Sequence, residues 1–305
     1  MALRRLQSLG GSAVFSLPYY VARDEGLFAE EGLDIEIPLQ TSYLDSSSAG
    51  IVLHEDHRTV NAFGDHLLPF ELGQAELYRA CEWGQIRRSH DSEREGRIIG
   101  RRSSVATQAI LVRPDSPYNI PQDLANVPIG VSFHHGSHYI AIQMLEGFLR
   151  RDELKIVGVT GGSRFSALRD GLLDAIAIME PWISVGEKLG YKVICEAHYI
   201  GSEIAGPGLD AETFTAINRA VTKGVHKINA DITPYLHYFV EEVPKDVVDL
   251  QPSDLHLNRL RFIDPAPYPE DQFERTFDWM VSWGLIAPDA GYEEIVHNRV
   301  SVTAR

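Results

Sequence analysis

Short apolar runs alternate with amphipathic segments through the middle of the chain, and this alternation restricts the possible folds more than any other feature. The runs VPIGVSF, LKIVGVT and DAIAIME, at residues 127–133, 154–160 and 174–180, each have the length of a buried β-strand. Between the last two lies SRFSALRDGLL, which is typical of a helix. Strands that alternate with helices predict an α/β protein with a mainly parallel sheet.

The same analysis covers the rest of the chain. Further strands are expected at residues 3–10, 33–40, 58–64, 108–117 and 191–197. A loop is expected at residues 64–66, and further helices at residues 16–32, 67–74, 210–231, 244–251 and 269–286. The charged stretch at residues 86–102 is expected to form a solvated loop, with a lid or an oligomer contact as the alternatives.

The net charge limits the classes of partner. The chain has 305 residues and a formal net charge of −15 at pH 7. This acidic balance argues against a nucleic acid or an anionic membrane as partner, because binding phosphate groups needs a basic surface. A local basic pocket for a small anionic ligand remains compatible with it, and so does a homo-oligomer.

The N-terminal sequence and the two cysteines bear on the compartment. MALRRLQSLGGSAVFSLPYY lacks the uninterrupted apolar core of a signal peptide, and no apolar run in the chain is long enough to span a membrane. We therefore expect a cytoplasmic protein. Cys81 and Cys195 do not have metal-ligand spacing and predict reduced, buried thiols.

Three stretches carry a family resemblance. They are PYYVARDEGLFAEEGLDIEI, LVRPDSPYNIPQDLANVPIGVSFHHGSHY and SALRDGLLDAIAIMEPWIS. Their order resembles that of substrate-binding proteins for sulfonates, nitrate and thiamine precursors. The resemblance implies a two-lobed type II periplasmic-binding-protein fold with ligand between the lobes. It implies a first part of lobe 1 at residues 1–108, lobe 2 at 109–200, and a return to lobe 1 with C-terminal helices at 201–305.

The layout is also similar to that of cytosolic enzymes on the same fold, among them a hydroxybiphenyl sulfinate desulfinase. That family has a nucleophilic cysteine in its first loop, where this chain has only Gly11, Ser12, Ala13 and Val14. Ala62 stands where the family has an arginine before a glycine turn. Desulfination by that route is therefore not expected.

Ligands of open α/β sheets bind beyond the carboxyl ends of the strands, so the residues at those ends are the site candidates. They are Ser12, Phe15 and Tyr19; Ser42 and Tyr43; Asp65 and His66; Ser132, Phe133, His134 and His135; and Glu180 and Trp182. The aromatic members suit a flat or aromatic ligand, although core packing explains each of them as well.

Two features predict how an anion is held. Gly136 and Ser137 open a helix, whose first N–H groups and dipole favour a carboxylate, sulfonate or phosphate. His138 belongs to the same helix start. Arg164 begins the next helix and can pair with the anionic group, or it can simply be a surface arginine.

Histidines at two strand ends suggest acid–base chemistry. We expect a lyase, decarboxylase-like, or a hydrolase, in which His66, His134 or His135 transfers a proton and Asp65 or Glu180 assists. The alternative is a non-catalytic binding protein or sensor in which the same residues only hold the ligand. No cofactor is expected, and a metal site is the less favoured alternative. HEDH at residues 54–57 contains metal-ligand types, but it lacks the helical zinc-protease spacing and predicts a polar surface loop.

Overall fold

The computed structural model of this chain describes residues 3–38 and 49–300, without the side chain of Asp65. Three of the predicted site residues are affected by these limits. Ser42 and Tyr43 lie outside the described residues, and only the backbone of Asp65 is described.

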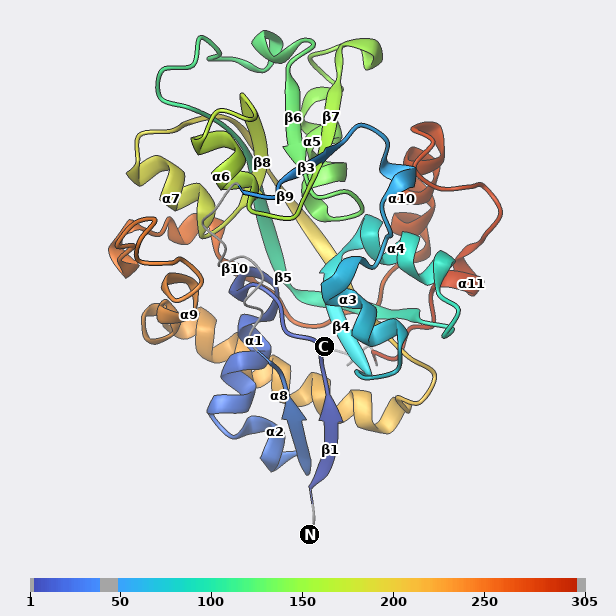
Figure 1. The fold of residues 1–305 in the computed structure, drawn as a ribbon. Coiled ribbons are helices and arrows are strands. Elements are labelled where there is room, and N and C mark those ends of the chain that lie inside the picture. The colour runs from blue at the N-terminus through green and yellow to red at the C-terminus, as the bar shows by residue number, and fades with distance from the viewer. Residues whose placement is uncertain (1–2, 39–48, 301–305) are drawn as a thin grey trace.

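Two α/β lobes lie one above the other in Figure 1. The lower lobe is built from β1 (Arg4–Gln7), β2 (Leu33–Glu36), α1 (Ala13–Asp24), α2 (Leu27–Glu30) and α8 (Ala211–Ala230). The upper lobe is built from β6 (Pro128–Val131), β7 (Lys155–Thr160), β8 (Ala175–Met179), α5 (Gly136–Leu145), α6 (Arg164–Arg169) and α7 (Trp182–Lys188). The two-lobed α/β architecture expected from the sequence is confirmed.

Two long strands, β5 (Arg97–Val112) and β9 (Lys192–Ala205), run from one lobe into the other. They pair antiparallel, and their register shifts between Arg101 and Val105. The predicted lobe boundaries after residues 108 and 200 fall inside these connecting strands and remain predictions.

The strand order places several strand ends together. The eight-stranded sheet has the order β3-β7-β6-β8-β5-β9-β4, with β10 paired to β5. Its inner strand β6 is parallel to both β7 and β8, with Gly130 opposite Val157 and Ile176. Because parallel strands end at the same edge of a sheet, the turns after β6, β7 and β8 lie side by side.

The remaining elements complete both lobes. They are β3 (Val52–His54), α3 (Gly64–Glu71), β4 (Leu77–Cys81), α4 (Glu82–Asp91), α9 (His237–Val240), β10 (Arg261–Phe262), α10 (Glu270–Ser282) and α11 (Tyr292–Ile295). Among the described residues, no helix is both long and apolar enough to cross a membrane. Cys81 and Cys195 are free thiols, the first buried and the second partly buried.

The strand and loop expected at residues 58–66 are wrong. His57–Thr59 is a 3₁₀ turn capped by the side chain of Asp56, and Gly64 already begins α3. The strand of this region comes earlier: β3 pairs antiparallel with β7, which puts His54 opposite Gly158. The side chain of Asn61 accepts a hydrogen bond from the Phe63 N–H at 2.8 Å, which is typical of a turn and not of a strand.

The solvated loop expected at residues 86–102 is also wrong, because the stretch contains most of α4 and the start of β5. Arg88 and Arg102 are fully buried, each with 0% exposure. Arg88 donates from Nε to the Ala62 carbonyl and from Nη2 to the His134 carbonyl, each at 2.8 Å. Backbone carbonyls thus accept hydrogen bonds from a charged side chain that the sequence pattern assigns to solvent.

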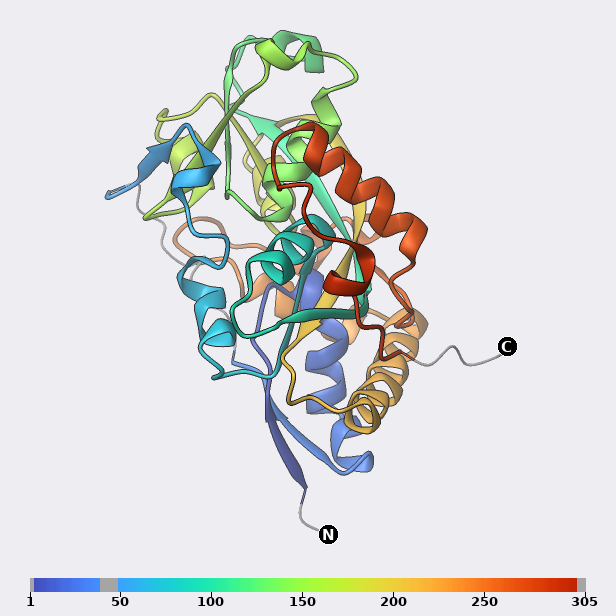
Figure 2. The ribbon, with the colours of Figure 1, turned by 90° about the vertical axis from the view of Figure 1, so that its right-hand side faces the viewer.

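The C-terminal helices cover one side of the molecule. Figure 2 shows α10 lying along that side, and α10 packs against α4. Trp279 and Trp283 both donate their indole N–H to Glu146 at the end of α5, at distances of 2.9 to 3.1 Å. These tryptophans therefore attach the C-terminal segment to the upper lobe.

Candidate functional site

A cavity of about 640 Å³ lies at the junction of the two lobes. The turns after β6, β7 and β8 supply one side of its lining, and the segment from Thr59 to His66 supplies another. The described lining residues are His54, Thr59, Val60, Asn61, Gly64, His66, Ser132, Phe133, His135, Val159, Thr160, Gly161, Gly162, Ser163, Arg164, Ile178, Met179, Trp182 and Glu242. Of the predicted site residues, this set contains His66, Ser132, Phe133, His135, Arg164 and Trp182.

The positively charged part of the lining forms where α6 begins. Arg164 donates through its guanidinium to the hydroxyl of Ser132, which follows β6. The Ser163 hydroxyl accepts from the backbone N–H groups of Phe165 and Ser166, at 3.1 and 3.4 Å. Because Ser163 caps this short helix itself, the side chain of Arg164 is the group that α6 offers to an anion.

Two imidazoles from different lobes stack in the lining. The rings of His66, in α3, and His135, before α5, lie 4.9 Å apart between centroids with an interplanar angle of 26°. Burial lowers the pKa of His135 well below its usual value, and the charge of Arg88 lowers it further. His135 is therefore neutral at pH 7, with one ring nitrogen that donates and one that accepts a hydrogen bond.

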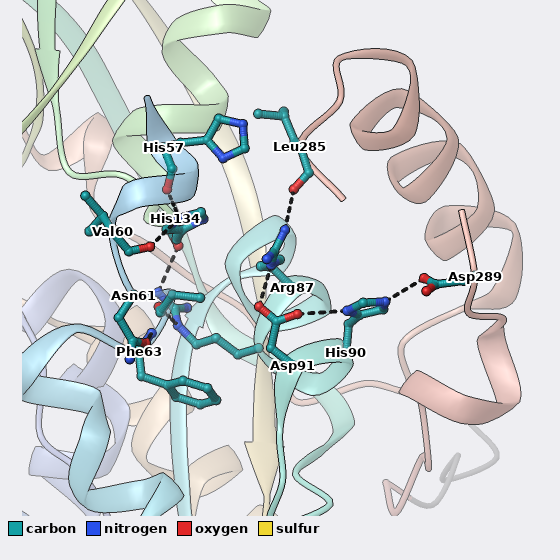
Figure 3. Close-up of polar contacts among 12 residues, drawn as sticks. His57, Val60, Asn61, Phe63, Arg87, His90, Asp91, His134, Leu285 and Asp289 are labelled. Atoms are coloured by element: carbon teal, nitrogen blue, oxygen red, sulfur yellow. Dashed lines mark hydrogen bonds and ion pairs between the residues drawn. The ribbon is translucent and has the colours of Figure 1, made fainter. Parts of the chain in front are cut away.

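His134 points away from the cavity, although it is adjacent to His135. Its Nε2 donates to the carbonyls of His57 at 2.8 Å and Val60 at 3.1 Å (Figure 3). Its backbone has a positive φ of 62°, and its side chain is buried. Burial lowers the pKa of His134 to about 4. This histidine holds the 57–60 segment in place, so the structure does not support the predicted proton transfer to a ligand.

We expect His134 to make the stability of the chain depend on pH. Its folded-state pKa of about 4 lies below the value of 6.5 that it has when unfolded, so the unfolded chain binds its proton first. Stability is then full above pH 6.5 and falls by an amount on the order of 3 kcal/mol as the pH drops to 4. Chemical denaturation across this range measures the effect.

His134→Gln is the matched variant for this measurement. Glutamine keeps an N–H donor near the position of Nε2 but does not titrate. The variant should lose the contribution of His134 and retain the pH dependence that comes from His57, His135 and His138, whose pKa values are also lowered. Identical pH profiles for the two proteins would contradict this role.

The start of α5 is enclosed behind the cavity. Ser137 Oγ accepts from the Ser132 N–H at 3.0 Å, and His138 Nδ1 accepts from the His134 N–H at 3.4 Å. A Cβ atom on Gly136 would lie 2.3 Å from the hydroxyl of Tyr199. None of these three α5 residues belongs to the cavity lining, so the structure does not support anion capture by this helix start.

Glu180 forms a buried ion pair and is not among the residues that line the cavity. Its carboxylate lies 3.3 Å from Arg259 Nη1 and accepts from the Ser184 N–H at 3.1 Å. Arg259 also pairs with Glu187 and Glu196. Burial raises the pKa of Glu180, as the sequence suggested. The geometry nevertheless gives this carboxylate the task of attaching the 252–260 segment to the upper lobe.

The predicted residues of α1 lie outside the lining as well. Ser12 Oγ donates to Glu242 at 2.8 Å, and the Tyr19 hydroxyl donates to the buried carboxylate of Glu203 at 2.9 Å. The guanidinium carbon of Arg102 lies over the Phe15 ring, 4.3 Å from the ring centroid. These contacts connect α1 to its own lobe. The first two also give the buried hydroxyl groups of Ser12 and Tyr19 a hydrogen-bond partner.

Three solved structures resemble this chain over nearly its whole length. The alkanesulfonate-binding protein SsuA from Xanthomonas axonopodis pv. citri, bound to MOPS, has a TM-score of 0.71 at 14% identity, covering 98% of this chain and 99% of that one. The Candida albicans CA3427 gene product, described as having the generic periplasmic binding protein fold, has a TM-score of 0.68 at 13% identity, covering 95% and 92%. The desulfurization enzyme DSZB has a TM-score of 0.57 at 13% identity, covering 93% of each chain.

This chain has the type II periplasmic-binding-protein fold. The resemblance seen in the sequence motifs is thereby confirmed at the level of the fold. No protein-family model matches the sequence, and no curated protein sequence matches it. The same fold is present in binding proteins and in an enzyme, so function has to be argued from the cavity.

Several lining residues of this fold escaped the sequence analysis. His54 was expected in a surface loop, but the pairing of β3 with β7 brings its Nε2 to 2.9 Å from Thr160 Oγ1 in the lining. Glu242 lies in no motif and comes from the segment after α9. Among the described residues, no group of three His, Cys, Asp or Glu side chains could hold a metal ion.

The apolar wall can be tested at Gly158. A Cβ atom on this glycine of β7 would lie 2.3 Å from Phe133 Cδ2, and Phe133 lines the cavity. Gly158→Ala should push the ring toward the ligand space and lower the thermal midpoint, with a cost of about 1–3 kcal/mol. Combining it with Phe133→Leu should restore part of the lost stability in the same thermal measurement. If the stability losses of the two single variants simply add in the double variant, the two side chains do not contact each other.

Proposed function

We propose that this chain binds a small organic anion reversibly in the interlobe cavity. The observation that carries the proposal is the pairing of Arg164 with Ser132 at the lining, where a guanidinium and a hydroxyl from adjacent turns converge. A guanidinium offers several N–H donors in one plane and suits the oxygens of a carboxylate, sulfonate or phosphate. The volume of about 640 Å³ suits a small molecule.

The rest of the lining complements such a ligand. The neutral imidazole of His135 can donate one hydrogen bond, while Phe133, Met179 and Trp182 provide apolar surface for a carbon skeleton. We infer a sulfonate as the first ligand class to test, since the structure bound to MOPS is an alkanesulfonate-binding protein of this fold.

Binding is better supported than the lyase reaction expected from the sequence. Acid–base catalysis needs a group that exchanges a proton with the substrate, and two predicted groups, His134 and Glu180, are engaged in structural contacts. The stacked pair His66–His135 keeps a catalytic alternative open, because both rings reach the cavity. A transporter component and a ligand sensor are two uses of the proposed binding.

The proposal predicts that the ligand stabilises the protein and is released without chemical change. In a sulfonate-free buffer, linear sulfonates, carboxylates or phosphonates should raise the midpoint temperature of thermal denaturation. Alcohols of the same length should not raise it. Proton NMR of the same mixtures over one day separates the two functions. Stabilisation without new resonances supports binding, whereas product resonances that disappear in His135→Gln would favour the lyase. No stabilisation by any anion would contradict the proposal.

A further inference from the structure

Glu242 differs from the other lining residues in charge and in origin. It lies two residues after α9, and its side chain reaches the first turn of α1. One carboxylate oxygen accepts from the Ala13 N–H, and the other accepts from Ser12 Oγ at 2.8 Å. The first turn of a helix favours negative charge, so Glu242 already occupies the anion position at the start of α1.

The cavity is therefore bipolar. Arg164 begins α6 in the upper lobe, whereas Glu242 contacts the start of α1 in the lower lobe (Figure 1). Glu242 is the one acidic side chain among the described lining residues. A ligand that contacts both residues spans the junction of the lobes. Its end at Arg164 should be anionic, and its end at Glu242 should be a hydrogen-bond donor or a cation.

We propose that the ligand carries an ammonium group, or a similar N–H-bearing cation, at the end opposite its anionic group, and that Glu242 binds it. This inference rests on the proposed function and narrows its ligand class to aminated organic anions. Where Glu242 is ionised, above a pKa of about 8, a ligand with a second anionic group would place like charges together, and an apolar end would leave a desolvated carboxylate without a counter-charge. Glu242 would thus select by disfavouring the wrong ligands as well as by binding the right one.

The ionisation of Glu242 supplies a second observable. Burial raises the pKa of Glu242 to about 8, although the hydrogen bonds from Ala13 and Ser12 act in the opposite direction. The free carboxyl is therefore mostly protonated at pH 7. A bound ammonium group favours the ionised form, so an aminated ligand should release a proton on binding near neutral pH.

The test compares isosteric probes in the full chain. The aminated probes are 2-aminoethanesulfonate, 3-aminopropanesulfonate and 4-aminobutanesulfonate. The affinity of each is compared with that of the alkanesulfonate that has a methyl group in place of the ammonium group. At pH 8.5, at least one aminated probe should bind the native protein about tenfold tighter than its isostere. Glu242→Gln should abolish this preference and bind the isostere more tightly than the native protein does, because the uncompensated carboxylate is gone, while Glu241→Gln, at an exposed neighbour, should change neither affinity.

Calorimetry adds a measurement that needs no variant. In two sulfonate-free buffers of different ionisation enthalpy, the aminated probe should release protons at pH 7 and the methyl isostere should not. Equal or tighter binding of the isosteres to the native protein would overturn the inference and leave the proposed function standing. If neither series binds, the proposed sulfonate function fails, and the inference fails with it.

Discussion

Arg164→Ala should weaken the binding of an anionic ligand by about 100-fold, since a charge-assisted hydrogen bond contributes 1.5–3 kcal/mol and a guanidinium can form two with one anion. Arg164 is placed for this by the turn after β7, and the hydroxyl of Ser132 orients its guanidinium. Isothermal titration with the best anionic binder measures the loss. Arg164→Lys keeps the charge without the planar pair of donors and should give an intermediate affinity.

Arg169→Ala is the matched control for Arg164. Arg169 ends the same helix, forms an ion pair with Asp170 and lies outside the cavity lining. Its replacement should leave the affinity within about twofold, because exposed ion pairs contribute little. An Arg164→Ala protein that binds as tightly as the native one would show that the anion sits elsewhere.

Arg88→Met should destabilise the chain by about 3 kcal/mol, because two buried carbonyls lose their donor at once. Those carbonyls belong to Ala62 and His134, on either side of the lobe junction. No carboxylate of the described residues forms an ion pair with Arg88, so removing its charge leaves no buried anion behind there. Because the His134–His135 turn loses its contact with α4, ligand affinity should fall as well. Urea denaturation and ligand titration measure the two effects.

The adjacent arginine provides the control for this prediction. Arg87 lies on the outer side of α4, where it pairs with Asp91 and donates to the Leu285 carbonyl at 3.1 Å (Figure 3). Arg87→Met should cost about 1 kcal/mol or less, since the ion pair of Arg87 with Asp91 is partly accessible to water. Equal losses for the two variants would mean that burial of the Arg88 guanidinium does not account for its effect.

The parts of this architecture that follow local periodicity were predictable. The runs that end at Ser132 and before Trp182 are short, apolar and separated by helices, so their carboxyl ends were expected to meet, and both residues line the cavity. The strand expected at 58–64 failed because capping by Asp56 and Asn61 favours turns over extended backbone. Apolar alternation alone carries no sign of such side-chain caps.

The finer parts of the site depend on contacts that no local pattern contains. His134 and His135 are neighbours in sequence, yet one ring contacts the 57–60 backbone and the other the cavity, because the positive φ of His134 turns the chain between them. Arg88 appeared to belong to a solvated stretch, and only the tertiary fold supplies its carbonyl partners. Glu242 enters the lining through a contact with Ser12, 230 residues away in the sequence.

The most direct test of the central claim is a crystal structure of the chain with the anion that stabilises it most, prepared with a bromine or selenium atom for anomalous scattering. The account predicts the anionic group within hydrogen-bond distance of Arg164 and Ser132, and the carbon skeleton against Phe133 and Trp182. A ligand bound outside the interlobe cavity, or one that lies in it with its anionic group turned away from Arg164, would contradict the account.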